Sequence, residues 1–246
     1  MKKRILVSAI VLALVAVLVM PMAALAGTTT DVGGTLDVPT ITGIDPATGV
    51  KGNTYIGVVI TGTYLTAATA VTFSGGDITT NTVAVVDATH ITCNVVIATG
   101  AALGARDVIV TNTPGGTDTL TGGFTVVAAT FTINAPGPIS LGIMVRDLAA
   151  TGNGSGTVET TAQNWTVTAK DASTGTNKGH MLSGSTPLAS ALGISKTASG
   201  YVDADVGITY TQAGGTTLKL YVSQTAVTAD TAGTYSITIT FTGSAQ

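Results

Sequence analysis

From Val38 onward, short apolar segments alternate with polar residues at every second position. In the C-terminal segment TYSITITFT, Tyr235, Ile237, Ile239 and Phe241 alternate with serine and threonine. This period of two is typical of a β-strand that buries one face. Comparable segments, separated by Gly-rich turns, recur roughly every ten residues, which predicts an all-β protein built from sandwiches.

The first block of predicted strands, residues 38–127, contains the segments YIGVVI, AVTF, VAVV, ITCNVVI and DVIV. In ITCNVVI, Ile91, Cys93 and Val95 share one face, so Cys93 is predicted to be a small buried hydrophobe. It is the only cysteine and cannot form an intramolecular disulfide. The alternative is an intermolecular disulfide or a reactive thiol.

The second block, residues 128–246, contains the predicted strands NWTVTAK, LKLYVSQ and TYSITITFT. Trp165, Val167 and Ala169 would face the core, with polar neighbours on the wet side of the sheet. GNGSGT and DASTGTNKGHMLSGSTP are predicted to be loops, the second long enough to carry a binding surface. Because no clear internal repeat links the blocks, we expect two unlike β-sandwich domains in tandem.

The N-terminal 26 residues have the pattern of a secretory signal peptide. Lys2, Lys3 and Arg4 precede an apolar run from Ile5 to Met20, and small residues lead to a predicted cleavage site after Ala26. The run is shorter than the roughly 20 residues of a spanning helix, although it could also serve as a short uncleaved anchor. No second apolar span follows, so no integral membrane span is expected after cleavage.

Residues 27–37, GTTTDVGGTLD, show no apolar periodicity and are predicted to be a flexible lead-in. Without the signal, seven basic residues remain against 13 acidic ones, a formal charge of −6. The basic residues are scattered, which argues against nucleic acid and anionic membranes as partners. With charged residues at only 9% and 48 threonines, solubility depends on hydroxyl groups, and the composition favours strands.

A recurring set of Pro, Gly and apolar positions characterises the first block: Pro39, Ile41, Ile44, Pro46, Gly49, Gly62, Phe73, Gly75, Gly76, Val108, Val110, Asn112 and Gly115. Pro46 and Gly49 would form the turn between the first strands, with Gly49 supplying a positive φ, and Gly62 would lie in the first turn. In these residues the first block resembles an IPT/TIG domain, and this resemblance implies an immunoglobulin-like fold for residues 38–127. It also implies contacts with protein or carbohydrate made by loops or exposed strand edges.

The second block is similar to β domains of WxL-type cell-surface proteins in the order of NWTVTAKD, GHM and TYSITITFTGS. The name-giving W-x-L triplet is absent, because Thr166 and Val167 follow Trp165.

Groups for catalysis are scarce: two His, one Cys, twelve Asp and the single Glu159. No nucleophile elbow, zinc-protease motif, phosphate-binding loop or dinucleotide fingerprint occurs. His90 and His180 fall in different predicted domains, so capping or surface roles are expected for them. The sequence therefore predicts a non-enzymatic protein without a cofactor, apart from the calcium alternative below.

Two kinds of candidate site remain. Asp203 and Asp205 in VDADVG are spaced like the first ligands of a calcium loop, but Gly207 occupies the fifth position and no Glu closes the loop. A solvated turn is the competing interpretation. Asn153 and Asn164 match the acceptor pattern for N-glycosylation, and Asn153, in its Gly-rich segment, is the better predicted acceptor.

The leading hypothesis is a secreted or cell-surface protein that binds or spaces cell-envelope proteins or glycans through its β-sandwich modules. One alternative is a carbohydrate-binding accessory module, although aromatic residues make up only 4% of the chain. Another is a polymerising surface-layer or fimbrial subunit. Its self-association would use residues 27–37 or the terminal strand as a donor strand.

Overall fold

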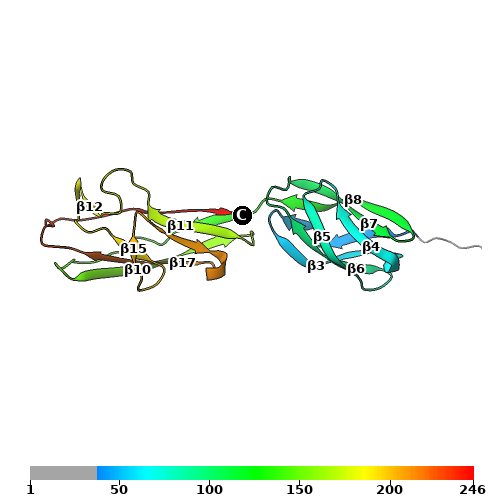
Figure 1. Ribbon diagram of the computed structural model, residues 1–246, viewed down its shortest axis with the longest axis horizontal. Coiled ribbons are helices and arrows are strands. Elements are labelled where there is room, and N and C mark those ends of the chain that lie inside the picture. Colours follow the sequence, from blue (N-terminus) through cyan, green and yellow to red (C-terminus); the bar gives the residue numbers. More distant parts are fainter. Residues whose placement is uncertain (1–37) are drawn as a thin grey trace, which may run out of the picture. The chain divides into compact units, whose positions relative to one another are not determined.

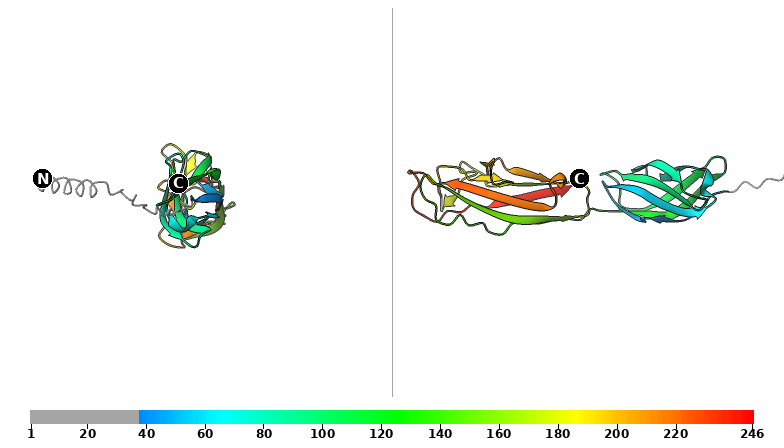
Figure 2. Two further views of the ribbon diagram at one scale, coloured as in Figure 1. Left: turned by 90° about the vertical axis from the view of Figure 1, so that its right-hand side faces the viewer. Right: turned by 90° about the horizontal axis from the view of Figure 1, so that it is seen from below.

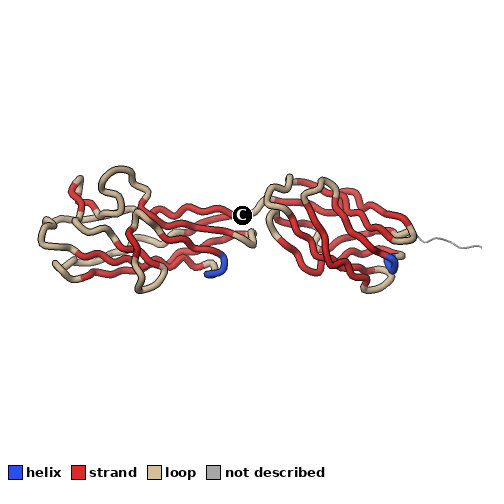
Figure 3. Tube along the Cα trace, in the orientation of Figure 1, coloured by secondary structure: helices blue, strands red, loops and turns tan. Residues whose placement is uncertain are grey.

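The computed structural model describes residues 38–246 and is built almost entirely of β-strands (Figures 1 and 3). The predicted signal peptide and lead-in lie outside the described residues. Within residues 38–246 the helical elements are two 3-10 turns, η1 Leu65–Ala67 and η2 Gln212–Gly214. The all-β prediction is confirmed, and in this range no helix has the length and apolarity needed to cross a membrane.

The first sandwich consists of two four-stranded sheets, with the orders β1-β3-β6-β5 and β2-β8-β7-β4. Neighbouring strands are antiparallel, except that β2 runs parallel to β8. This order is that of an immunoglobulin-like sandwich, in which strands A, B, E and D share one sheet and C, F and G the other. The strands are β1 Thr40–Asp45, β2 Thr48–Val50, β3 Thr54–Thr63, β4 Ala68–Phe73, β5 Ile78–Val85, β6 His90–Ile97, β7 Gly104–Asn112 and β8 Gly116–Val127.

The core of the first sandwich lies between these sheets. Every second residue of β6 is buried, including Cys93, as the alternation predicts. Phe73 and Phe124 meet edge to face with ring centroids 5.1 Å apart. Full burial of one such apolar side chain contributes about 1.5–3 kcal/mol, so hydrophobic packing holds this domain together without a disulfide.

The buried Cys93 provides a direct test of this core. Burial raises the pKa of its thiol to about 11, and the thiolate is the reactive form. We expect iodoacetamide at pH 8 to leave Cys93 unmodified in the folded protein and to alkylate it once urea unfolds the first sandwich. Timed alkylation followed by mass spectrometry measures this directly. Rapid labelling in native buffer would contradict the packing described here.

Two glycines of the first sandwich have roles other than those expected. Gly62 lies within β3, paired with Ile41, rather than in a turn, and a Cβ there would overlap the Thr40 carbonyl oxygen. Gly49 lies in β2 and does not adopt a positive φ. A Cβ at Gly49 would come within 2.6 Å of the Phe124 ring. Close packing of strands and core, rather than turn geometry, therefore requires glycine at both positions.

The second sandwich packs a five-stranded sheet, β15-β14-β17-β10-β9, against a three-stranded sheet, β16-β11-β18 (Figure 2). The predicted strands NWTVTAK and LKLYVSQ correspond to β11 and β17, and Trp165 is buried as expected. Between β11 and β14 in the sequence, β12 and β13 pair with each other as a small hairpin. The strands are β9 Phe131–Asn134, β10 Ala149–Thr160, β11 Trp165–Asp171, β12 Leu182–Ser183, β13 Thr186–Pro187, β14 Gly193–Ser195, β15 Val202–Asp203, β16 Ile208–Thr211, β17 Thr217–Thr225 and β18 Ile239–Ala245.

The predicted GNGSGT loop is wrong, because this segment forms the middle of β10. Its glycines alternate along the strand, and they leave space for the chain that follows β9. A Cβ at Gly152 would lie 2.7 Å from Ile139, and one at Gly154 would lie 3.0 Å from Pro136. Here glycine makes room for side chains of another chain segment, a role that a sequence pattern cannot distinguish from a turn.

Four hydrogen bonds connect Asn53 and Thr54, at the start of β3, with residues that precede β11. The buried Asn53 donates through Nδ2 to the Thr161 carbonyl (2.9 Å) and accepts at Oδ1 from the Gln163 amide (2.8 Å). The Gln163 side chain in turn accepts from the Thr54 amide (2.7 Å) and donates to its carbonyl (2.8 Å). The buried amide of Asn53 is thereby satisfied on both of its polar atoms.

Candidate functional site

The second sandwich contains an apolar cleft between two chain segments, residues 136–146 and residues 231–241. It consists of two adjoining hollows with volumes of about 490 and 750 Å³. These volumes are in the range of ligand sites in proteins. Both hollows are lined by Pro138, Ile139, Leu141, Met181 and Tyr235.

The cleft is open because neither of these segments forms regular strand where the two face each other. β9 ends at Asn134, and Pro136 and Pro138 lack the N–H groups that a paired strand would need. On the other side, regular strand begins only at Ile239. The predicted terminal strand is therefore shorter than its alternation indicates. Between Tyr235 and Thr238 only Ser236 is bridged, through two hydrogen bonds with Leu182 of 2.8 and 2.9 Å.

The walls of the cleft are an exposed part of the hydrophobic core. Ile237, Ile239 and Phe241 are only partly buried, and they pack on a cluster that includes Leu220 and Val222. The adjoining segment leaves three large apolar side chains in solvent: Ile143, Val145 and Leu148, exposed by 93%, 57% and 62%. Contiguous exposed apolar surface of this kind marks interaction sites on soluble proteins.

One edge of β18 borders the cleft. The strand pairs with β11 through seven residue pairs, from Asp171–Ile239 to Trp165–Ala245. In the described part of the chain, its sheet contains no strand beyond β18, so the outer edge is unpaired. Because Ile239 and Phe241 of β18 line the cleft, apolar side chains lie beside the unpaired backbone edge of the strand. Such an edge can accept an added strand.

Tyr210 supports the floor of the cleft from the core. Its ring stacks on Phe241 with centroids 6.3 Å apart, and its hydroxyl donates to the Lys219 carbonyl at 2.6 Å. Burial raises the pKa of Tyr210 to about 12, so the ring stays neutral at physiological pH. This contact fixes the ring of Phe241 against the three-stranded sheet.

The rim of the larger hollow carries one cation and one anion. Arg146 contacts the Asp230 carbonyl through Nη2 at 3.4 Å, and no ion pair of Arg146 is formed within residues 38–246. The Asp230 carboxylate accepts hydrogen bonds from the amides of Ala189 and Val227, both at 2.7 Å. Asp230 therefore holds the surrounding loops, whereas the guanidinium of Arg146 is available to an acidic ligand group.

A polar hollow of about 500 Å³ lies across the Ser236–Thr240 segment from the cleft. Its carboxylate, Asp171, is buried and accepts from Ser173 Oγ (2.6 Å), the Gly179 amide (2.7 Å) and the Ser173 amide (3.0 Å). Burial opposes its charge, but these hydrogen bonds and the nearby Lys178 outweigh that effect and lower the pKa. His180, on the same hollow, donates through Nδ1 to the Leu188 carbonyl at 2.6 Å. The Asp171 carboxylate and the His180 imidazole therefore stabilise the loops around this hollow through hydrogen bonds.

The sequence-predicted calcium ligands do not come together with other ligands. Asp203 ends β15, and its carbonyl accepts from the amides of Val206 and Gly207, which forms a turn containing Asp205. Within residues 38–246, no group of three or more His, Cys, Asp or Glu side chains is placed to hold a metal ion. A calcium site at Asp203 and Asp205 stays a prediction.

The two glycosylation candidates are both exposed. Asn153 lies in β10, paired with Tyr221, rather than in the expected loop. Asn164 lies just before β11, and its carbonyl accepts from the Gln246 amide at 2.9 Å. Glycosylation at either residue stays a prediction, and the preference for Asn153 loses its basis because both acceptors border or belong to strands.

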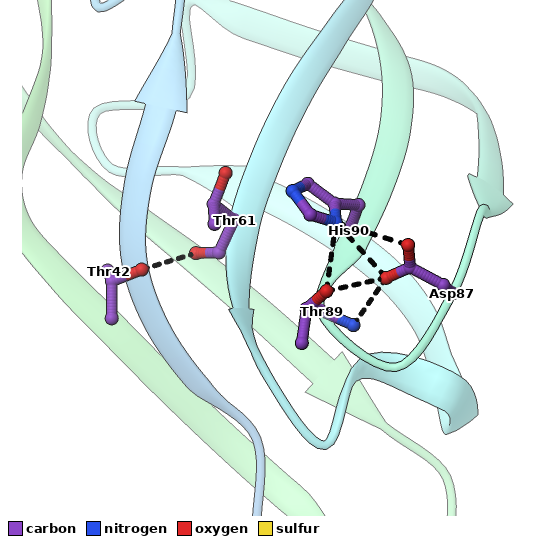
Figure 4. Close-up of polar contacts among 5 residues, drawn as sticks. All are labelled: Thr42, Thr61, Asp87, Thr89 and His90. Atoms are coloured by element: carbon purple, nitrogen blue, oxygen red, sulfur yellow. Dashed lines mark hydrogen bonds and ion pairs between the residues drawn. The ribbon is translucent and has the colours of Figure 1, made fainter.

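A surface cluster in the first sandwich resembles a catalytic arrangement only in composition (Figure 4). Thr89 Oγ1 and Asp87 Oδ1 both contact the same nitrogen of His90, Nδ1, at 2.9 and 3.1 Å. A nucleophile relay needs both imidazole nitrogens, one for the hydroxyl and one for the carboxylate. Hydrogen bonds from the Thr89 hydroxyl and amide lower the pKa of Asp87 to about 2. The cluster therefore stabilises the turn between β5 and β6. In Figure 4, the Thr42 hydroxyl similarly donates to the Thr61 carbonyl.

Comparison with known proteins leaves the family open, since no family model and no curated protein matches the chain. Among solved structures, SGBP-B of the mixed-linkage glucan utilization locus of Bacteroides ovatus, in complex with a heptasaccharide, shares 11% identity with a TM-score of 0.27. The alignment covers 76% of this chain and 52% of that one, so the chain spans about half of that protein's length.

Two further solved structures show similar values. SGBP-B from a xyloglucan utilization locus of Bacteroides uniformis has 12% identity, a TM-score of 0.28, and coverage of 84% of this chain and 72% of that one. The IG1+IG2 fragment of DIP-gamma has 12% identity, a TM-score of 0.25, and coverage of 83% and 96%. At these values the similarities carry no inference about a ligand, and the functional argument depends on the cleft.

Sequence reasoning missed this cleft, although two signals for it are present. The prolines at 136 and 138 interrupt the alternation after β9, and the segment LGIMV that follows is apolar without a strand's polar alternation. An apolar segment that cannot pair in a sheet has to be buried by something else or remain exposed. In the structure Ile143 and Val145 remain exposed.

Proposed function

We propose that this chain is a non-enzymatic binding protein of the cell surface or extracellular space, and that the apolar cleft of its second sandwich binds a polypeptide segment of a partner. The observation that supports this most strongly is the cleft beside an unpaired strand edge, continued by the exposed Ile143, Val145 and Leu148. The signal peptide predicted for residues 1–26 would agree with this location. The IPT/TIG resemblance of residues 38–127 and the WxL resemblance of residues 128–246 agree with a surface role.

The chemistry of the cleft favours a polypeptide over a glycan. Flat aromatic platforms of the kind that stack on sugars are scarce here, since Tyr235 and Phe241 are the aromatic residues of the lining. The smaller hollow is mainly aliphatic, and the larger one combines aliphatic with polar side chains. Trp165 is buried in the core and cannot offer a platform. An apolar lining next to free backbone N–H and C=O groups suits a peptide that adds both side-chain and main-chain contacts.

Replacement of Ile143 by Asp tests the proposal. Because Ile143 is 93% exposed, the variant should fold normally, while a charge on the rim should weaken binding of an apolar segment about tenfold or more. The measurement is the fraction of purified protein that remains on the cell-envelope fraction of the source organism after washing, as a function of protein concentration.

Ile56→Asp is the matched control, since Ile56 is 76% exposed in β3 of the first sandwich. The control should be retained like the unchanged protein. Equal retention of the Ile143 and Ile56 variants would show that the cleft is not part of the binding surface.

Turnover of a glycan or ester substrate, abolished by replacement of a single Asp, would refute the non-enzymatic assignment. Binding to a glycan array that depends on Ile143 would favour the carbohydrate-binding alternative.

A further inference from the structure

The unpaired edge of β18 and the apolar cleft beside it together form a site for one additional strand. The second sandwich has strands in the positions of A, B and E of an immunoglobulin-like sheet, β9, β10 and β17, and β11 and β18 in the positions of C and F. Strand G would lie beside F, at the outer edge of β18. In the described residues that position is open, and the cleft occupies it.

The lead-in has no sustained apolar periodicity, but it carries two large apolar side chains four residues apart. In the sequence TDVGGTLD, residues 30–37, Val32, Gly34 and Leu36 occupy one set of alternate positions. Asp31, Gly33, Thr35 and Asp37 occupy the other set. In an extended chain, one face would therefore be apolar or small and the other polar. This alternation is too short, with two large apolar side chains, to specify a core strand by itself.

The dimensions of segment and cleft agree. In an extended strand Val32 and Leu36 would be about 13 Å apart, and the lining from Tyr235 to Phe241 extends over about 20 Å. Two side chains at this spacing fit within the length of the cleft.

The segment has to come from another molecule. Thr40 at the start of β1 pairs with Thr63 at the end of β3, whereas Asn53, which contacts the second sandwich, lies at the beginning of β3. β3 has ten residues and a length of about 30 Å. Only Val38 and Pro39 connect residues 30–37 with β1, and this linker is too short to span the length of β3 and reach the cleft of the same chain.

We propose that residues 30–37 of one copy bind as an added strand in the cleft of a second copy, along the outer edge of β18, so that copies join head to tail. This rests on the proposed binding function of the cleft. Val32 and Leu36 fill the apolar cleft, and the backbone pairs with β18. Because the donor and acceptor surfaces differ, the contact is heterologous and adds further copies at both ends.

The test uses the chain from Gly27 to Gln246, which retains all described residues, in sedimentation velocity over a range of concentrations. The unchanged chain should form oligomers that grow with concentration. Val32→Asp with Leu36→Asp should weaken association about a hundredfold or more, because two apolar side chains lose their burial. Ile143→Asp should weaken it from the acceptor side. Ile143 is 93% exposed, so its replacement removes no core contact, and circular dichroism together with thermal unfolding verifies that each variant is folded.

Mixing the two variants separates this inference from other modes of association. The Ile143 variant keeps an intact donor segment, and the Val32/Leu36 variant keeps an intact cleft. Each variant alone should be monomeric, and the mixture should give a dimer that does not grow further.

A second measurement uses disulfide crosslinking. Leu36→Cys and Ile237→Cys in different copies should form an interchain disulfide, whereas Thr35→Cys, on the opposite face, should crosslink far less.

Two results would overturn the inference. A monomeric wild-type chain at all concentrations would exclude assembly, and oligomers that persist in the Val32/Leu36 variant would show that another segment mediates it. In either case, loss of envelope retention by the Ile143 variant would leave the proposed function of the cleft intact. If the Ile143 variant both binds the envelope and assembles like the unchanged chain, the cleft has neither role.

Discussion

Gly62→Ala should destabilise the first sandwich by about 3 kcal/mol or more, since the added methyl group cannot be accommodated without moving backbone. Gly62 pairs with Ile41, the second residue pair of the β1–β3 ladder, and a Cβ there would overlap the carbonyl oxygen of Thr40, with Ile41 Cα only 3.2 Å away. The obstacle is main chain, so rotation of a side chain cannot relieve it. Urea denaturation followed by the exposure of Cys93 measures the effect on this domain.

Gly43→Ala is the matched control in the same strand pair. No atom lies within 4 Å of a Cβ at Gly43, and its φ is not in the left-handed region. This variant should stay within about 0.5 kcal/mol of the unchanged protein or be slightly more stable. Equal losses at both positions would mean that the alanines act through a general loss of strand geometry and not through the contact with Thr40.

Asp171→Ala should destabilise the second sandwich by about 3 kcal/mol. The substitution removes a buried carboxylate and leaves the amides of Gly179 and Ser173 without their acceptor, each at a cost of about 1–3 kcal/mol. It would also release the loop that leads to Met181, which lines the cleft. Thermal unfolding and the envelope-retention assay should therefore both respond.

The exposed Asp203 supplies the control, because Asp203→Ala should change stability by less than about 0.5 kcal/mol.

Acid titration gives a second check on the role of Asp171. The folded pKa of Asp171 is lowered, so its contribution is fully present above the unfolded carboxyl pKa of about 3.9 and is lost as the pH falls below it. The stability difference between the unchanged protein and Asp171→Ala should shrink below about pH 4. A difference that is constant with pH would show that packing, and not the charge, is responsible.

Strand positions were predictable from the sequence because burial on one face imposes a period of two on side-chain polarity. The alternation in HITCNVVI, NWTVTAK and LKLYVSQ corresponds to β6, β11 and β17, with the expected residues buried. This information is local: it depends on neighbouring side chains along one strand. The same property explains why the all-β class and the burial of Cys93 and Trp165 were correct.

The positions of several glycines were predicted incorrectly from the sequence. Gly62, Gly49 and the glycines of β10 were expected in turns, and each lies in a strand where another part of the chain comes close. A missing side chain permits either a positive φ or a close contact, and the sequence does not distinguish the two. Which of them applies depends on residues far away in the chain, such as Thr40 for Gly62 and Ile139 for Gly152.

By itself, then, the sequence determined the β class, the two blocks of strands and the residues that face each core, because these follow from the alternation along single strands. The tertiary structure decided where the sheets leave a gap. Tyr235, Ile237, Ile239 and Phe241 alternate as in any half-buried strand, but whether their apolar face is covered depends on the strands opposite. The prolines after β9 keep the facing segment out of the sheet, so this face opens into the cleft.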